Sequence, residues 1–373
     1  MEYRSASPSL QMINDMKTKS NSPLININWP PSSLNITKLS DKMVDDAYDV
    51  MIVDSLAYVA IGNDGIKLLN ISDPFQPIPI GHFDEDGYSY QMYVSESYAY
   101  IADGSNGLEV INFSDPTDPV KVGEFDDYAE SWLEQDISEI CATNVYVSES
   151  IAYVTDWYEG LEILNISDPT NPVEIGHSFN GRQSFDVHIS GSYAYVAEFH
   201  DGLSIIDISN ITSPERVGRF DTEGETTSVF VIGSYAYLTN SDFGLIIIDI
   251  SNPISPVEVG NFYDGGYARD VYVSESLAYV ADGDEGLEII DISNVSAPIE
   301  IGQFNDGGNV RAVYVSESLA YVADGDDGLE ILLIEERLGI TSISGFNPIL
   351  ILSSIGAISV ILIYKRRKKS SFQ

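Results

Sequence analysis

The chemistry of one set of aromatic side chains, which lie beside carboxylates in the sequence, indicates a binding site. They are Trp132, Trp157, Tyr158, Phe199 and Phe243. Four of them stand in loops whose counterparts elsewhere in the chain hold small or acidic residues, and Trp132 belongs to an acidic insertion within residues 128–142. Aromatic rings stack on sugars and on peptide side chains, which predicts a patch for a surface glycan or protein. The alternative is that the insertion folds over these rings and that they serve only in packing.

Oxygen-rich hairpins form a second set. The segments that contain Asp282, Asp284, Asp324 and Asp326 offer carboxylates of the kind that bind Ca²⁺. Their spacing differs from that of the EF-hand loop, because glycine stands where that loop has its fifth-position ligand. Solvated turns built on Asp side chains account for the same residues. We therefore expect no cofactor, with Ca²⁺ as the alternative.

No group of residues matches a known catalytic motif. The histidines His82, His177, His188 and His200 fall at different positions of a repeated segment, which does not suit a metal site. Cys141 is the only cysteine, so no intrachain disulfide can form. The sequence contains no Gly-x-Ser-x-Gly, no HExxH and no phosphate-binding loop. We expect a protein without enzymatic activity.

A segment of about 42 residues repeats seven times and positions all of these side chains. The copies align on Tyr58, Tyr100, Tyr153, Tyr195, Tyr237, Tyr279 and Tyr321, which are evenly spaced apart from one interval lengthened by the insertion. Each copy holds four short apolar runs separated by turn residues, as propeller blades do. The last copy lacks its fourth run, and an unmatched apolar stretch lies at Leu34–Leu39. We predict an all-β, seven-bladed β-propeller of four-stranded antiparallel blades over residues 34–336, with strand 34–39 closing blade 7.

The repeated stretches GLEIIDISN, GLSIIDISN and GLEILNISDPTNP resemble the LVIVD-repeat family of β-propellers, which is common in bacterial and archaeal surface proteins. The resemblance covers roughly residues 48–336. It implies the propeller fold. The family as a whole has no assigned reaction or ligand, so the resemblance implies nothing about activity.

Charged residues at or near the starts of the first strands would face the mouth of a propeller channel. They are Arg182, Asp186, Arg269, Asp270 and Arg311. A hydrolase or lyase would need acid and base groups that converge on such a site. Arginines and aspartates at corresponding positions of successive blades also suit salt links between blades, and we favour that interpretation.

The charge balance excludes one class of partner. The chain has 58 acidic and 18 basic residues, and five of the basic ones occupy residues 365–369. Subtracting the 13 remaining basic residues from the 58 acidic ones leaves 45 net negative charges before the tail. Such a surface repels phosphate backbones, so we expect no nucleic-acid partner. It suits a soluble propeller, which we expect to be monomeric.

The C-terminal end has the pattern of a membrane anchor. An apolar span at residues 347–365 follows a linker at 337–346 and is long enough to cross a hydrocarbon core as one transmembrane helix. The basic tail at 366–373 belongs in the cytoplasm by the positive-inside rule, which places the propeller outside. The tail also resembles the sorting signals of archaeal surface proteins, although the Ser-Gly-Phe at 344–346 lacks the Pro that precedes Gly-Phe there.

The N-terminal segment, residues 1–33, contains no apolar stretch like the core of an export signal. Either the natural start lies upstream of Met1, or the protein is tail-anchored with its propeller inside. The second arrangement conflicts with the charge rule, so we expect the first.

These features together predict a single-pass cell-membrane protein whose extracellular propeller acts as a non-enzymatic binding, adhesion or protein-interaction module. The alternatives are an extracytoplasmic hydrolase or lyase with a central-channel site, and an envelope assembly scaffold.

Overall fold

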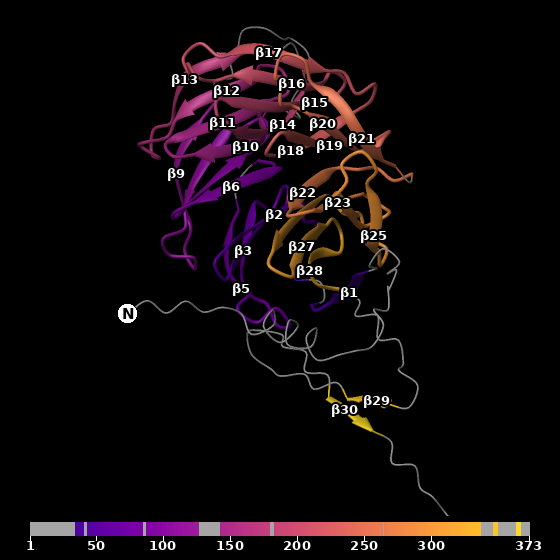
Figure 1. Cartoon of the computed structure of the whole chain (residues 1–373). Coiled ribbons are helices and arrows are strands. Elements are labelled where there is room, and N and C mark those ends of the chain that lie inside the picture. Colours follow the sequence, from indigo (N-terminus) through magenta and orange to yellow (C-terminus); the bar gives the residue numbers. More distant parts are fainter. Residues whose placement is uncertain are drawn as a thin grey trace, which may run out of the picture. The chain divides into compact units, whose positions relative to one another are not determined.

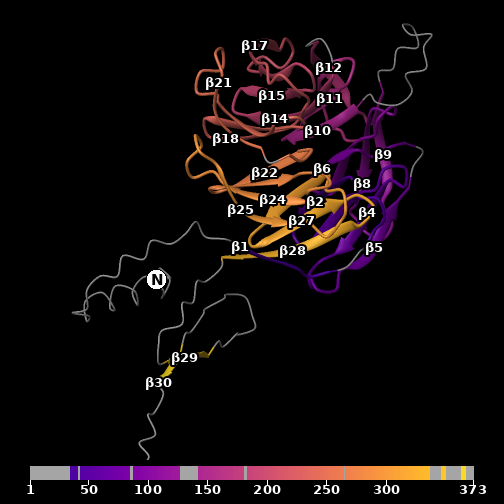
Figure 2. The same cartoon turned by 90° about the vertical axis from the view of Figure 1, so that its right-hand side faces the viewer.

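The computed structural model describes residues 34–40, 43–84, 87–126, 142–179, 183–263 and 265–336, and the backbone of two short strands at 346–349 and 363–366. All regular structure in these residues is β-strand. Seven four-stranded antiparallel sheets follow one another along the chain and are arranged as blades around a central channel (Figures 1 and 2). The predicted seven-bladed propeller is confirmed.

Each of the first six blades is made of four consecutive strands, whose order in the sheet follows their order in the chain. Blade 1 contains β2 (Asp49–Val53), β3 (Leu56–Ala60), β4 (Ile66–Asn70) and β5 (Ile78–Phe83). Blade 2 contains β6 (Gln91–Ser95), β7 (Tyr98–Ala102), β8 (Leu108–Asn112) and β9 (Val120–Phe125). Blade 3 contains β10 (Ala142–Ser148), β11 (Ile151–Asp156), β12 (Gly160–Asn165) and β13 (Val173–Ser178). Blade 4 contains β14 (Ser184–Ser190), β15 (Tyr193–Glu198), β16 (Gly202–Asp207) and β17 (Glu215–Phe220). Blade 5 contains β18 (Thr226–Ile232), β19 (Tyr235–Asn240), β20 (Gly244–Asp249) and β21 (Val257–Phe262). Blade 6 contains β22 (Asp270–Ser274), β23 (Leu277–Ala281), β24 (Leu287–Asp291) and β25 (Ile299–Phe304).

Blade 7 is completed by a strand from the other end of the propeller. It contains β26 (Ala312–Ser316), β27 (Leu319–Asp324), β28 (Gly328–Glu336) and, as its fourth strand, β1 (Leu34–Lys38). The antiparallel register pairs Leu34 with Glu336 and Lys38 with Leu332. Figure 1 shows β1, from the start of the described chain, beside β28. The predicted closing strand therefore pairs as expected, and it joins the two ends of the propeller.

The hydrophobic core is divided among the boundaries between blades. Each of seven clusters combines buried residues from two neighbouring blades; one, for example, contains Tyr58 and Leu68 of blade 1 with Met92 and Ile111 of blade 2. Strands with neighbours on both faces need nearly continuous apolar runs, and the sequence provides them in the second and third strand of each blade. Each blade thus depends on its neighbours for burial of its apolar surface.

The turns between first and second strands need one residue in the left-handed backbone region. Glu96, Glu149 and Glu275 occupy this position with a φ of 55°. Gly191 and Gly233 replace glutamate in blades 4 and 5, with a φ of 62°. Such two-residue turns match the twist of the strands that they join.

The expected transmembrane helix at 347–365 lies largely outside the described residues. At its two ends, Phe346–Ile349 (β29) and Ile363–Arg366 (β30) form a two-stranded antiparallel ladder. Within the described part of the chain, no helix has the length and apolarity needed to span a bilayer. Trp132, Cys141 and Arg182 also lie outside the described residues.

Candidate functional site

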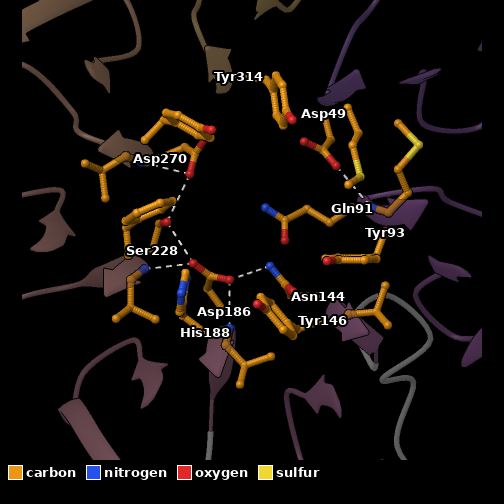
Figure 3. A pocket seen from close by; sticks show the side chains of 18 of the residues that line it. Asp49, Gln91, Tyr93, Asn144, Tyr146, Asp186, His188, Ser228, Asp270 and Tyr314 are labelled. Carbon is orange, nitrogen blue, oxygen red and sulfur yellow. Dashed lines mark hydrogen bonds between the residues drawn. The ribbon is translucent and has the colours of Figure 1, made fainter. Parts of the chain in front are cut away.

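The first strands of the seven blades enclose a central channel with a cavity of about 170 Å³. Alternate residues of a strand point to the same side, so the first strands of blades 1 to 6 each contribute two residues to successive layers of the lining, and that of blade 7 contributes one. Figure 3 shows this lining from close by. The first layer, here called the polar layer, comprises Asp49, Gln91, Asn144, Asp186, Ser228 and Asp270. The second layer, here called the collar, comprises Met51, Tyr93, Tyr146, His188, Phe230, Tyr272 and Tyr314.

Three aspartates of the polar layer join neighbouring blades through backbone amides. Asp49 of blade 1 accepts the N–H of Val50 at 2.8 Å and the N–H of Met92 in blade 2 at 3.0 Å. The equivalent bonds join Asp186 to Val187 and Val229, and Asp270 to Val271 and Val313. Each carboxylate uses both oxygens to hold two first strands together. At these positions the links between blades are made by carboxylates and backbone amides. The predicted arginine salt link is present at Arg311 of blade 7, which forms an ion pair with Asp46 of blade 1 at 2.9 Å.

Ser228 connects two of these carboxylates. Its Oγ lies 2.7 Å from Asp186 Oδ2 and 3.0 Å from Asp270 Oδ1, and Asn144 donates to Asp186 from the opposite side. A hydroxyl carries one proton, so Ser228 can donate to only one carboxylate at a time. The other contact is favourable when that carboxyl group is itself protonated and donates to Oγ.

Burial makes protonation of the channel carboxylates easier. Desolvation raises the pKa of Asp49 to about 7 and that of Asp270 to about 6, and it also raises the pKa of Asp186. The charges of Asp186 and Asp270 add to the shift of Asp49, whereas the amide hydrogen bonds oppose it. In the collar, burial lowers the pKa of His188 to about 4, so its imidazole is neutral at pH 7.

The collar is a chain of aromatic contacts around the channel. Centroids of successive rings from Tyr93 to Tyr314 are 4.9–5.4 Å apart, and Met51 stands at the equivalent position of blade 1. Figure 3 shows the side chains of Tyr93 and Tyr314 projecting toward the channel. Carboxylates, amides, a hydroxyl and phenols thus line one small cavity. This lining can exchange protons and hydrogen-bond a small polar guest.

Outside the channel, three rings from the hairpins and first strands of blades 3 and 4 form a cluster, here called the aromatic wall. Trp157 and Phe199 have centroids 5.4 Å apart, and Phe185 lies 5.8 Å from Trp157 and is stacked on Phe199 at 5.9 Å. All three side chains are half-buried. Trp157 and Phe199 occupy the hairpin position that Gly62 and Gly104 hold in blades 1 and 2.

The other residues of the predicted aromatic patch are Tyr158, Phe243 and Trp132. Tyr158 follows Trp157 in the same hairpin and is half-buried. Phe243 belongs to blade 5 and is 42% exposed, and none of the ring contacts among the described residues includes it. Trp132 lies in the insertion outside the described residues. Of the five predicted side chains, Trp157 and Phe199 are in ring contact, and Phe185 joins them.

The two predicted arginines that the structure describes do not contribute to the channel lining. The guanidinium carbon of Arg311 lies 3.7 Å from the ring centroid of Tyr48, and its Nη1 donates to Asp46 at 2.9 Å. The guanidinium carbon of Arg269 lies 4.9 Å from the ring centroid of Tyr267. Within the described residues, neither arginine forms an ion pair with a channel aspartate.

A cluster of three carboxylates lies where blades 6 and 7 meet, but it differs from the predicted calcium set. Oxygens of Asp306, Asp324 and Glu330 lie within 4.8 Å of one another. The Lys38 ammonium group is 2.8 Å from Asp306 and also bonds Glu330, so the closing strand β1 supplies a cation to this cluster. Of the predicted ligands Asp282, Asp284, Asp324 and Asp326, only Asp324 belongs to it.

Seven consecutive segments of the chain match the family model described as LVIVD repeat. They are residues 45–85, 86–127, 141–178, 181–222, 223–264, 265–306 and 307–334. The chain belongs to the LVIVD-repeat family. The resemblance inferred from the repeated motifs is confirmed, and each matched segment corresponds to one blade. No curated protein matches the sequence.

Solved structures share the fold of this LVIVD-repeat protein at low sequence identity. The WD40 β-propeller domain of Doa1 aligns with a TM-score of 0.62 at 10% identity, over 81% of this chain and 98% of that chain. The computationally designed Ika8 protein aligns with a TM-score of 0.59 at 8% identity, over 79% of this chain and 99% of that chain. Identities this low show a common fold alone.

Two features of this LVIVD-repeat site escaped the sequence analysis, although the repeat register contains them. Asp49 stands at the position equivalent to Asp186 and Asp270, so alignment of all seven copies identifies it as the third linking aspartate. Phe185 directly precedes the channel aspartate Asp186 in blade 4, as Arg269 directly precedes Asp270 in blade 6. Comparing the residue before each channel aspartate would therefore have added Phe185 to the aromatic patch.

Proposed function

We propose that this LVIVD-repeat propeller is a non-enzymatic binding module that engages a glycan or a protein through the aromatic wall. The observation that carries the proposal is the mutual contact of Trp157, Phe185 and Phe199. Repeat symmetry is broken there by large half-exposed rings, whereas glycine takes the equivalent hairpin position in four other blades. Loops held by a rigid ring of strands are suitable supports for such a site.

Polar groups beside the wall support recognition of a hydroxylated ligand. Glu159 follows Trp157 and Tyr158 in the same hairpin, and its side chain is exposed. Its carboxylate can accept hydrogen bonds from hydroxyl groups while a neighbouring ring stacks on a sugar face. Aromatic stacking with an adjacent acceptor suits a glycan or a polar protein surface.

The bonding of the channel carboxylates supports a role without catalysis. Both oxygens of Asp49, Asp186 and Asp270 accept backbone amide hydrogens from two blades. Carboxylates held in this way suit the joining of blades better than the proton transfers of a hydrolase or lyase.

A mutation of the wall tests the proposal on a glycan array and on intact cells. Trp157→Ala should abolish binding without a change in melting temperature. Phe75→Ala is the matched control, because Phe75 is 63% exposed in a turn of blade 1, and this variant should bind normally. A lower melting temperature for Trp157→Ala with binding retained would show that the wall serves only in packing.

The cell-surface location is part of the same proposal. The apolar residues 347–365 and the basic residues 366–373 support a single membrane anchor with the propeller outside. Protease added to intact cells should remove the propeller and leave a fragment that carries a C-terminal tag. Protection of the propeller would contradict this topology.

A further inference from the structure

The cavity in the central channel combines an oxygen-rich layer with an aromatic one. The polar layer offers carboxylates, amides and a hydroxyl, and the collar adds Met51 and six rings, counting the His188 imidazole. The cavity of about 170 Å³ is many times larger than the roughly 10–15 Å³ that one water needs. Among the described residues that line it, none is a lysine or an arginine. A space lined by acids and rings, without a base, favours a cation.

Asp49 has acceptor capacity to spare. An ionised carboxylate offers about four lone-pair positions. Those of Asp186 are filled, because its oxygens contact two backbone amides, Asn144 and Ser228. Among the described residues, Asp49 accepts from two backbone amides only, at 2.8 and 3.0 Å, one at each oxygen. Asp49 is also half-buried, whereas Asp186 is buried. A donor that enters the channel therefore finds its acceptor at Asp49.

Gln91 lies beside Asp49 in the polar layer. The next residue, Met92, donates its N–H to Asp49 at 3.0 Å, so Gln91 and Asp49 stand at the same level on neighbouring strands. Figure 3 shows the Gln91 amide projecting into the channel without a hydrogen bond to the other residues drawn. Its oxygen is a second acceptor. A primary ammonium group has three donors to offer to such a pair.

The channel aspartates do not come together as metal ligands do. A bound Ca²⁺ takes about six to eight oxygens at about 2.3–2.6 Å, so its carboxylate ligands converge on one point. Within the described part of the chain, oxygens of three acidic groups meet within 4.8 Å at Asp306, Asp324 and Glu330, outside the channel. The three aspartates of the polar layer come from blades 1, 4 and 6 and form no such group. Carboxylates spread around a channel suit a cation that is larger than a metal ion.

The collar provides an apolar wall next to Asp49 and Gln91. Met51, Tyr93 and Tyr314 occupy the collar positions of blades 1, 2 and 7. Figure 3 shows Tyr93 and Tyr314 on either side of Asp49 and Gln91. The collar and the polar layer lie two residues apart along a strand, which is about 7 Å. A short alkyl chain covers this distance, and the methylene groups next to its charged nitrogen gain from contact with aromatic rings.

The charges of the lining also favour a bound cation. Its titratable groups are four tyrosines and Asp49, Asp186, Asp270 and His188. His188 is neutral at pH 7, so the three ionised carboxylates face no positive charge within the lining. Burial and, in addition, the charges of the other two aspartates raise the pKa of Asp49 to about 7. Arg269 and Arg311 lie outside the lining, and Arg311 is paired with Asp46. A cation in the channel relieves the repulsion among the carboxylates.

We propose that the channel binds a primary alkylammonium ion, whose charged group is held by Asp49 and Gln91 and whose chain lies in the collar. Met51, Tyr93 and Tyr314 form the wall for this chain. The site is separate from the aromatic wall, so the inference goes beyond the proposed function.

Calorimetric titration of the full chain with n-butylammonium at pH 8 tests the site, with the ionic strength kept constant by sodium chloride. n-Butylammonium should bind and raise the melting temperature, whereas neutral n-butanol should not bind measurably. At pH 5 the affinity should be at least about tenfold weaker, because the ligand then competes with a proton on Asp49, whose pKa is about 7. The amine stays charged at both pH values, as the amine of lysine does.

Substitutions in the polar layer locate the site. Gln91→Lys attaches an alkylammonium group inside the channel and keeps the bonds between Asp49 and the backbone amides, so it should fold and abolish n-butylammonium binding. Gln91→Met has a similar length without the charge, and it should weaken binding without abolishing it. Asp49→Asn should weaken binding at least about tenfold through loss of a charged hydrogen bond. Asp118→Asn is the matched control in an exposed turn between β8 and β9, and its affinity should stay within about twofold.

Absence of binding to the wild type, or unchanged affinity in both Asp49→Asn and Gln91→Lys, would overturn the proposal. Binding of n-butanol as tight as that of n-butylammonium would exclude a cation site. Tetramethylammonium has no N–H donor and should bind more weakly than n-butylammonium, so equal affinity would contradict the role of the two acceptors. Stronger stabilisation by Ca²⁺ than by n-butylammonium at equal ionic strength would replace the amine site by a metal site.

Discussion

Ser228 Oγ lies 2.7 Å from Asp186 Oδ2 across the boundary between blades 5 and 4. The same hydroxyl lies 3.0 Å from a carboxylate oxygen of Asp270 in blade 6, and Asn144 in blade 3 donates to Asp186. Four consecutive blades are thereby joined by side chains at a single level of the channel. Since one hydroxyl proton serves two carboxylates, the protonation state of the channel is coupled to the cohesion of the ring.

The stability of the propeller should decrease as the pH rises through neutrality. Asp49 and Asp270 have folded pKa values of about 7 and about 6, above the ordinary 3.8, so the folded chain binds these protons more tightly than the unfolded chain does. The stability that this difference provides is fully present below pH 3.8 and is lost as the pH rises through the folded values. His188 acts in the opposite sense, because its folded pKa of about 4 lies below its ordinary value of 6.5. The stability that the neutral imidazole provides is therefore lost as the pH falls toward 4.

Because carboxyl groups outnumber this single histidine, we expect the melting temperature to fall between about pH 5 and about pH 8. Asp49→Asn should lower the free energy of unfolding by about 1–3 kcal/mol, and with it the melting temperature, at all pH values, because one acceptor of a backbone amide is lost. It should also make the decrease with pH shallower. A slope equal to that of the wild type would show that Asp49 does not titrate in this range.

Replacement of Lys38 should destabilise blade 7 strongly. Lys38→Met removes the cation that bonds Glu330 and Asp306 and leaves the fully buried Glu330 side chain without its partner. Breaking such a pair costs about 3–5 kcal/mol. Lys67→Met makes the same change in charge at a lysine for which the described residues provide no ion pair, and it should have a much smaller effect. Chemical denaturation measures both values.

A second substitution separates charge from packing at this position. Glu330→Gln in the Lys38→Met background should recover part of the lost stability, because the buried group is then neutral. No recovery would mean that the lysine stem, through its packing, accounts for the effect.

Two glycines in equivalent fourth strands should respond differently to alanine. A Cβ at Gly218 would lie 1.8 Å from the backbone oxygen of Pro253 in the next blade, which cannot move without disturbing that blade. At Gly302 the closest atoms belong to the side chains of Leu34 and Ile36 in β1, both at 3.3 Å. Gly218→Ala should cost at least about 1–3 kcal/mol, whereas Gly302→Ala should stay within about 1 kcal/mol. Equal losses in urea denaturation would contradict this account of blade contacts.

Removal of the closing strand should weaken the whole ring. Deleting residues 1–40 removes all five residues of β1 and uncovers the β28 edge and the apolar side chains between blades 6 and 7. We expect a markedly lower melting temperature and self-association through the open edge. Restoring Leu34–Lys38 behind an unrelated leader should reverse both effects, and an unchanged melting temperature in the deleted protein would exclude a closing role.

The repeat period was sufficient to predict the fold, because every copy carries the same four apolar runs and the one missing run is matched by Leu34–Leu39. The candidate site was predicted in part. Trp157 and Phe199 were found because they replace glycine within a regular pattern. The hydrogen bond between Asp186 and Val229 could not be predicted in the same way, because its acceptor and donor lie in different blades. Its donor is a backbone amide, which every residue except proline has, so the pattern of side chains does not indicate it.

The closing strand has a consequence for synthesis in the cell. β1 leaves the ribosome before every blade, and its partner β28 follows roughly 300 residues later, which at 5–20 residues per second is a delay of about 15–60 s. During this interval the first six blades can assemble without β1. When β28 emerges, the β1 segment of a neighbouring nascent chain competes with the chain's own for the same edge. Closely spaced ribosomes on one messenger RNA therefore favour strand-exchanged dimers, whereas ribosomes that are farther apart favour the closed monomer.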